Sequence, residues 1–354
     1  MSKLVVTGGC GFLGYHVCNL LKDKYDEIVV IDIDKFVAKD YPKNVVYIKQ
    51  DIRHFDTLKV AMKGADAVMH GAAALPLWSD KDIYTTNLDG TRNVLQAAKE
   101  NGTKRVVYVS STAVYGVPEK HPLYETDPLI GVGPYGITKI GAEKICEEFR
   151  AKGLEVPIVR PKTFIGTGRL GVFQILYDWV EAGALIPTIG NGKNRYELLE
   201  VEDLVNAIYL MLTLPAEKAN DTFNIGAKDT KQVKVYLEEF FAAVGARSKV
   251  MTTPAWFIIF WLEIFWMLRL SPLYKWVYGT AHKDSFVSTD KAEKQLGWIP
   301  RFTEAQALTR AYNWYMLHKA EVAGASGVTH RVAWKQGILG LFKGLMAALN
   351  TKKK

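Results

Sequence analysis

The stretch KLVVTGGCGFLGYHVCNLLKDKYDEIVVIDID, residues 3–34, contains the pattern that decides the fold. Apolar, β-branched residues at its two ends predict strands, and the middle predicts an amphipathic helix. Between the first strand and the helix, Gly8, Gly11 and Gly14 follow a G-x-x-G-x-x-G spacing. Glycines there let the turn close tightly and let backbone N–H groups and the helix N-terminus meet a pyrophosphate. The stretch therefore predicts a dinucleotide-binding βαβ unit.

An acidic residue, Asp32, ends the second predicted strand. A carboxylate there accepts hydrogen bonds from ribose hydroxyls and repels a 2′-phosphate, so it favours NAD over NADP. Short β-branched runs follow at 44–49, 67–73 and 105–111, with helical sequence between them. This alternation predicts an α/β fold, a Rossmann-type doubly wound parallel sheet with a smaller C-terminal substrate domain. The alternative is a glycine turn in some other α/β protein.

The length and the charge bound the organisation. With 354 residues and 49% apolar content, the chain can bury a substantial core. We expect an NAD-binding domain in 1–165, completed by later segments, a substrate-binding part in 166–320, and a basic tail in 330–354. Residues 331–354 contain six Lys or Arg and no acid, so much of the formal charge of +8 belongs to this tail. That placement argues against nucleic acid and suits anionic lipid.

Three cysteines, Cys10, Cys18 and Cys146, are too few and too scattered for a disulfide framework or a zinc site. They fit a reducing compartment. The first predicted strand begins at residue 3, so we expect no signal peptide. The sequence predicts a cytoplasmic protein without a metal.

A second pattern concerns catalysis. A predicted strand ends in VSSTAVYG, residues 109–116, and a predicted helix begins near YGITK, residues 135–139. The spacing puts Tyr135 and Lys139 on one helical face, where an ammonium favours the phenolate and lets the tyrosine act as a general base or acid. A serine at the strand end could hold a substrate oxygen. An ordinary amphipathic helix is the alternative.

Several motifs occur in order: TGGCGFLG at 7–14, DIR at 51–53, HGAA at 70–73, NLDGTRNVLQAA at 87–98, SSTAVYG at 110–116, YGITK at 135–139, RPKTFIG at 160–166 and DKAEKQLGWIP at 290–300. On these motifs the chain resembles the extended short-chain dehydrogenase/reductase family, also called the NAD-dependent epimerase/dehydratase family. The resemblance runs from about Leu4 to about Tyr315 and implies NAD as the cofactor. In many relatives the helices near Asn87 and Tyr135 form a dimer interface, which implies a homodimer.

The resemblance also assigns residues. The catalytic residues would be Ser111, Tyr135 and Lys139. The cofactor-binding residues would be Gly8, Gly11, Phe12, Leu13, Gly14, Asp32, Asp51, Ile52, Ala72, Asn87, Tyr135 and Lys139. Tyr135 would remove the hydroxyl proton, Ser111 would steady the oxygen, and Lys139 would also bond the nicotinamide ribose. Whether the hydride leaves as NADH or returns to the substrate separates a dehydrogenase from an epimerase.

Three positions bear on the substrate. Nucleotide-sugar members usually have Asn where this chain has Thr163, and Arg195 is one residue out of their usual register. Trp78 makes the preceding loop more similar to the 3β-hydroxysteroid dehydrogenase and dihydroflavonol reductase branches, whose substrates are apolar. A core or rim aromatic is the alternative for Trp78.

An aromatic run at 254–278 contains four of the nine tryptophans, yet its uninterrupted apolar part is too short to span a bilayer. Trp and Tyr favour the membrane–water boundary, which indicates a lipid-facing helix; a buried helix is the alternative. The tail has apolar residues at helical spacing flanked by lysines, typical of an interfacial helix, unless it docks on the body or on a second subunit. We therefore expect an NAD-dependent oxidoreductase for a sterol- or lipid-like alcohol, peripheral at the inner face of a membrane. A nucleotide-sugar epimerase or dehydratase is the alternative.

Overall fold

A computed structural model describes residues 2–76, 78–268, 275–322 and 339–351. It divides the chain into two compact units. The first unit contains Met1–Phe164, Val201–Gly226 and Val287–Pro300, and the second contains Ile165–Glu200, Ala227–Phe286 and Arg301–Lys354. The chain passes from the first unit to the second within the short strand β7 (Thr163–Ile165).

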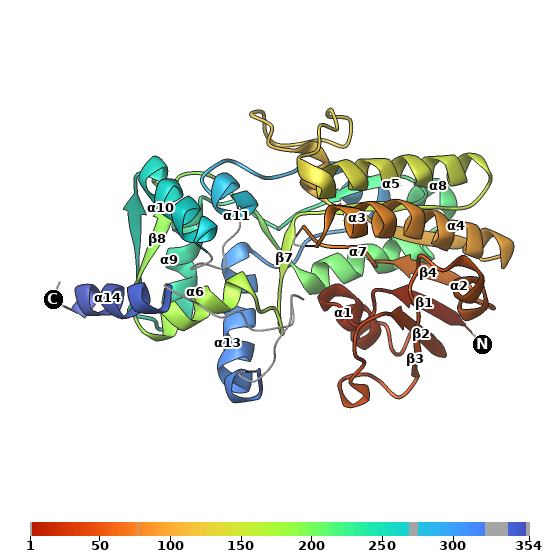
Figure 1. Cartoon of the computed structure of the whole chain (residues 1–354), viewed down its shortest axis with the longest axis horizontal. Coiled ribbons are helices and arrows are strands. Elements are labelled where there is room, and N and C mark those ends of the chain that lie inside the picture. Colours follow the sequence, from red (N-terminus) through yellow and green to blue (C-terminus); the bar gives the residue numbers. More distant parts are fainter. Residues whose placement is uncertain (1, 77, 269–274, 323–338, 352–354) are drawn as a thin grey trace. The chain divides into compact units, whose positions relative to one another are not determined.

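The first unit is built on a sheet of seven parallel strands in the order β10-β6-β5-β4-β1-β2-β3 (Figure 1). The strands are β1 (Lys3–Thr7), β2 (Glu27–Asp32), β3 (Val45–Lys49), β4 (Ala67–His70), β5 (Arg105–Val109), β6 (Ile158–Pro161) and β10 (Thr222–Ile225). The strand order reverses between β1 and β4, and ligands of such sheets bind at the carboxyl ends of strands beside that point. The predicted Rossmann-type sheet is confirmed.

Helices cover this sheet because its strands are apolar on both faces. They are α1 (Phe12–Leu20), α2 (Phe55–Ala61), α3 (Asp80–Tyr84), α4 (Thr91–Glu100), α5 (Gly133–Ala151), α7 (Val201–Thr213), α8 (Ala216–Ala219) and α12 (Asp290–Leu296). Shorter turns are η1 (Ala38–Asp40), η2 (Thr85–Gly90) and η3 (Thr112–Tyr115). Helices α4 and α5 run side by side (Figure 1). They share one core with the strands, which includes Leu95, Phe149 and Val106.

The second unit contains a small parallel pair, β8 (Leu185–Ile189) and β11 (Lys249–Thr253), and the strand β9 (Leu198–Glu200). Its helices are α6 (Val172–Glu181), α9 (Val233–Ala243), α10 (Ala255–Met267), α11 (Lys275–Thr280), α13 (Glu304–Val322) and α14 (Leu339–Thr351). Tyr177, Phe240 and Leu308 from three of these helices form its core. Of the expected basic tail, residues 339–351 form α14, and the remainder lies outside the described residues. Within the described ranges, no helix is long and apolar enough to cross a membrane.

Candidate active site

The turn between β1 and α1 is so tight that side chains are excluded from it. Gly8 has φ +73°, a left-handed conformation that favours glycine, and a Cβ there would lie 2.7 Å from the backbone nitrogen of Ala72. A Cβ on Gly14 would lie 2.5 Å from the carbonyl oxygen of Gly8, and one on Gly11 would lie 3.2 Å from the same oxygen. The three spaced glycines therefore bring the turn, the start of α1 and the segment after β4 together.

Asp32 is held in place at the end of β2, beside this turn. Its Oδ2 accepts a hydrogen bond from the backbone N–H of Cys10 at 2.8 Å, and its Oδ1 accepts one from the N–H of Asp34 at 3.0 Å. Burial and the neighbouring Asp32 charge raise the pKa of Asp34. The Asp32 carboxylate therefore has a fixed orientation next to the glycine turn.

These features fit an adenosine dinucleotide. The glycine turn leaves backbone open at the N-terminus of α1, where the first N–H groups of a helix have no partner within it and can meet a pyrophosphate. Asp32 ends β2, which pairs with β1, so a carboxylate for the ribose hydroxyls lies one strand away. Phe12 and Leu13 are buried at the start of α1, directly after the glycine turn.

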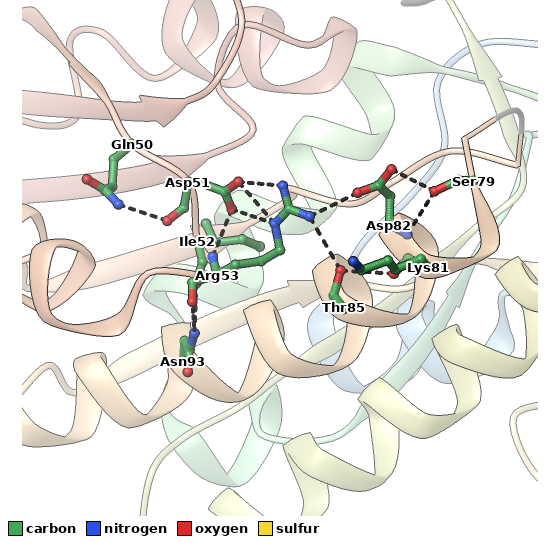
Figure 2. A network of polar contacts seen from close by, with 9 residues as sticks. All are labelled: Gln50, Asp51, Ile52, Arg53, Ser79, Lys81, Asp82, Thr85 and Asn93. Carbon is green, nitrogen blue, oxygen red and sulfur yellow. Dashed lines mark hydrogen bonds and ion pairs between the residues drawn. The ribbon is translucent and has the colours of Figure 1, made fainter.

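A network around Arg53 connects two segments of the first unit (Figure 2). Its Nη2 donates to Asp51 Oδ2 at 2.7 Å, and its Nη1 donates to Asp82 Oδ1 at 3.0 Å in α3. The arginine lowers the pKa of Asp51 against the opposing effect of burial. Ile52 between the pair is buried, and a Cβ on Gly90 would lie 2.5 Å from its side chain. The guanidinium thus ties the loop after β3 to the segment that follows Trp78.

Lys139 lies deep beneath the expected catalytic tyrosine. It is 3% exposed, and its Nζ donates to the carbonyl oxygen of Val109 at 2.8 Å and to Tyr108 Oη at 3.3 Å. Its Nζ also lies 5.8 Å from the centroid of the Tyr135 ring. Burial lowers the pKa of Lys139 to about 8, and the charge of Glu143 opposes that shift.

Ser111 lies two residues after the end of β5, the strand that Lys139 contacts. Its Oγ accepts a hydrogen bond from the N–H of Ala113 at 3.2 Å and caps η3. Because Lys139 bonds the end of β5 at Val109, the helix with Tyr135 and the strand end with Ser111 are joined. The structure therefore places Lys139 beside Tyr135 and bonds it to the end of β5, two residues before Ser111.

Asn87 is a buried connector. Its Oδ1 accepts from the N–H of Ala74 at 2.9 Å, and its Nδ2 donates to Thr138 Oγ1 at 3.0 Å. Thr138 in turn donates to the carbonyl oxygen of Tyr135 at 3.0 Å. Asn87 thus fixes the segment after β4 to the first turns of α5.

The sequence reasoning missed three residues close to this group. Glu143 lies one helical turn after Lys139 and is hydrogen-bonded by Ser110 Oγ and by Arg160. The signal was available: Lys139 and Glu143 repeat the four-residue spacing of Tyr135 and Lys139.

The structure does not define a single site for the three expected substrate residues, Trp78, Thr163 and Arg195. Trp78 is partly buried, and its backbone N–H donates to the carbonyl oxygen of Leu75 at 3.0 Å. Thr163 lies in β7 at the end of the first unit. Arg195 belongs to the second unit, where its guanidinium lies 5.6 Å from the centroid of the Phe286 ring.

The second unit carries a joined apolar surface on α10 and α14. Within α10, Leu262 is the buried residue, while Trp256 is 73% exposed. The rings of Phe265 in α10 and Phe342 in α14 lie 6.1 Å apart. The exposed apolar side chains of the two helices and the residue after α10, here called the α10–α14 surface, are Trp256, Phe257, Phe260, Trp261, Trp266, Met267, Leu268, Leu341, Phe342, Leu345 and Leu349.

Helix α14 is apolar on more than one side. Leu339, Met346 and Ala347 pack against the core of the second unit, and Asn350 Nδ2 donates to the carbonyl oxygens of Gly183 and Arg247. The docked side and the exposed side are therefore both apolar, which is unusual for a helix whose exposed side meets only water.

Comparisons with known proteins agree with this geometry. A sequence model of the NAD dependent epimerase/dehydratase family matches residues 4–226, more than half of the chain. The 3 beta-hydroxysteroid dehydrogenase type 7 of Homo sapiens is 29% identical over 360 residues, which cover 88% of this chain and 96% of that protein. The UDP-glucose 4-epimerase of Halalkalibacterium halodurans is 26% identical over 345 residues, which cover 89% of this chain and 96% of that protein.

Among solved structures, MoeE5 in complex with UDP-glucose and NAD superposes with a TM-score of 0.73 at 22% identity, covering 90% of this chain and 100% of that one. That likeness concerns the fold. The family match adds that the enzymes of the group depend on NAD, which the glycine turn and Asp32 fit. The chain belongs to the NAD-dependent epimerase/dehydratase family.

Proposed function

We propose that the chain is an NAD-dependent oxidoreductase acting at a secondary alcohol or ketone of an apolar, sterol- or lipid-like substrate. The observation that carries the substrate class is the α10–α14 surface, on which two helices that meet at the Phe265–Phe342 contact both expose aromatic and aliphatic side chains. Monomeric soluble proteins rarely expose a large contiguous apolar patch unless it binds something apolar. The similarity to a steroid dehydrogenase supports the same class.

The catalytic roles follow from the buried ammonium. A cation 5.8 Å from the Tyr135 ring favours the phenolate, which can take the proton of the substrate hydroxyl. Ser111 Oγ would hydrogen-bond the substrate oxygen as it becomes a carbonyl. NAD, when bound, supplies the acceptor for the hydride that leaves the carbinol carbon. In the reverse direction, Tyr135 returns the proton to the oxygen.

The cofactor would lie along the edge that these residues share. Backbone at Gly8, Gly11, Phe12, Leu13 and Gly14 would meet the pyrophosphate, and Asp32 would meet the adenosine ribose. The cofactor site would also be lined by Asp51, Ile52 and Ala72. Asn87 would hold this site in shape through its hydrogen bonds to Ala74 and Thr138. Lys139 would bond the nicotinamide ribose as well.

A nucleotide-sugar 4-epimerase or dehydratase is the second candidate. The similarity to a UDP-glucose 4-epimerase over most of both chains favours it. The same Ser111, Tyr135 and Lys139 serve both reactions, so the difference lies in the fate of the hydride. Thr163 and Arg195 are the positions where this chain departs from the sugar-binding pattern.

We also propose where the enzyme works and in what form. The aromatic character of the α10–α14 surface and the lysines of the tail suit peripheral contact with the inner face of an anionic membrane. Cys10, Cys18 and Cys146 form no disulfide, which fits a cytoplasmic location. A homodimer through α4 and α5 is the expected assembly, and the half-exposed Ile137 on α5 supports it.

In the test, the purified chain and NAD are mixed with 3β-hydroxysterols in detergent in one set of tubes and with UDP-sugars in another. Accumulation of NADH with a sterol, lost in Tyr135→Phe, is the expected result. A changed sugar ring without net NADH would instead establish the epimerase.

A further inference from the structure

The carboxylate of Glu143 is buried in α5, one helical turn beyond Lys139. Glu143 as a whole is 2% exposed. It accepts a hydrogen bond from the Oγ of Ser110, which directly precedes Ser111. It also accepts from Arg160 in β6, with Nη2–Oε2 at 2.6 Å and Nε–Oε1 at 3.0 Å. One carboxylate therefore joins the helix that carries Lys139 to the end of β5 and to β6.

Arg160 is itself held, so the ion pair has a fixed geometry. Its Nη1 donates to Tyr115 Oη at 2.8 Å and to the carbonyl oxygen of Glu125 at 3.1 Å. Tyr115 Oη then donates to Asn224 Oδ1 at 2.8 Å. A buried polar chain in which each member has a partner is rigid, and it keeps the Glu143 carboxylate from turning away.

We propose that Glu143 is a positioning residue that fixes α5 against the strand end carrying Ser111 and keeps the Lys139 ammonium charged. This inference rests on the proposed function, because that function places Ser111 and Lys139 in the active site. Glu143 acts through its neighbours, Ser110 on one side and Lys139 on the other.

Lys139 needs an anionic neighbour because its surroundings oppose a charge. Burial lowers its pKa to about 8, and Glu143 acts in the opposite direction. Buried charges of opposite sign attract more strongly than the same charges in water. The titratable and charged groups around this pair are Tyr135, Cys146 and Arg150 of α5, Tyr108 of β5, His70 of β4 and Arg160 of β6. None of these six described groups is a carboxylate, so the negative charge next to Lys139 comes from Glu143.

Binding of NADH, followed by its fluorescence, reports on Lys139 without any substrate. The dissociation constant is measured from about pH 6 to about pH 10 for the full chain and four variants. Glu143→Gln removes the charge, Glu143→Asp keeps it, and Lys139→Met removes the titrating group. Glu155→Gln is the matched control, because it breaks another largely buried pair, with Arg105, at the opposite end of β5.

The wild-type affinity should weaken with a midpoint near pH 8. In Glu143→Gln the midpoint should fall by about one pH unit, since a neighbouring charge shifts a buried group by that order. Glu143→Asp and Glu155→Gln should keep the wild-type midpoint, and Lys139→Met should show no transition.

An unmoved midpoint in Glu143→Gln, together with a transition that depends on Lys139, would overturn the inference and leave the proposed function standing. A wild-type transition that persists in Lys139→Met would instead remove Lys139 from the cofactor site. If Glu143→Gln fails to fold because Arg160 is left as an unpaired buried charge, the variant Glu143→Gln/Arg160→Met removes both charges. Its midpoint should also fall, and a midpoint at the wild-type value would overturn the inference.

Discussion

The ring of Phe265 in α10 lies 6.1 Å from the ring of Phe342 in α14, with 40° between their planes. The contact joins two helices that are far apart in the sequence and belong to the same unit. Together with Leu268, which follows α10, the two helices expose eleven of the twenty-five large exposed hydrophobic residues in the described part of the chain. An apolar surface of this kind suits a lipid interface.

Substitutions on that surface should weaken membrane binding. Trp256→Ser or Phe260→Ser should each lower the partition onto vesicles of phosphatidylcholine and anionic phosphatidylglycerol by about tenfold, because each removes a large apolar side chain from the lipid. Sedimentation with the vesicles measures the effect. The control is Leu317→Ser in α13, which removes an 81% exposed leucine outside the surface. Equal sedimentation of wild type and all three variants would contradict membrane contact through α10.

A methyl group at Gly14 should destabilise the first unit. Its Cβ would lie 2.5 Å from the backbone of Gly8 and Gly9, which cannot move aside as a flexible side chain can. We expect a loss of about 2–4 kcal/mol in the free energy of unfolding, measured in urea, and a loss of NADH binding. Gly344→Ala in α14 is the matched control, because nothing lies within 4 Å of the added Cβ. A Gly14→Ala protein as stable as Gly344→Ala would show that the turn is looser than described.

Removing the Asp32 carboxylate should change the choice of cofactor. In Asp32→Ala the affinity for NAD should fall by at least about tenfold, because charge-assisted hydrogen bonds to the ribose are lost. The affinity for NADP should fall less or should rise, because Asp32 no longer repels the 2′-phosphate. Equilibrium binding of both dinucleotides measures the ratio, with the exposed Asp23→Asn as control. An unchanged ratio in Asp32→Ala would place the ribose elsewhere.

His70 should make the stability of the fold depend on acid pH. It is fully buried between Thr7 and Thr91, and burial followed by the Lys139 charge lowers its pKa from 6.5 to about 3. Below pH 6.5, His70 therefore binds a proton in the unfolded chain but not in the folded chain. The free energy of unfolding falls as the pH falls. The loss from this residue should be about 1.4 kcal/mol per pH unit until the pH nears 3.

Urea unfolding at several pH values between these limits measures that slope. His70→Gln should show a shallower decline than wild type, whatever its absolute stability. The exposed His54→Gln should keep the wild-type slope. Identical slopes for wild type and His70→Gln would mean that His70 is protonated in the folded protein.

Much of the first unit could be predicted from the sequence because its signals are local. Gly11 and Gly14 of the β1–α1 turn are required by contacts with Gly8 and Gly9, a few residues away, and the alternation of strands and helices is a property of neighbouring positions. The spacing of Tyr135 and Lys139 likewise fixes their common helical face. These features needed no knowledge of distant contacts.

The partners of Glu143 and the docking of α14 could not be predicted in the same way. Ser110 and Arg160 meet Glu143 because β5, β6 and α5 come together in three dimensions. The sequence of α14 allowed a lipid-facing helix or a docked helix, and the structure combines a docked side with an exposed apolar side. Long-range packing decided both cases.

Isotope transfer shows whether a hydride leaves the carbinol carbon of an apolar secondary alcohol and reaches NAD. A 3β-hydroxysterol carrying deuterium at the carbinol carbon is placed in anionic vesicles and incubated with the chain and NAD, and the NADH is analysed by mass spectrometry. We expect deuterated NADH with wild type and none with Tyr135→Phe. No deuterium in NADH from any apolar alcohol, together with inversion of a UDP-sugar by the same preparation, would contradict the proposed hydride transfer.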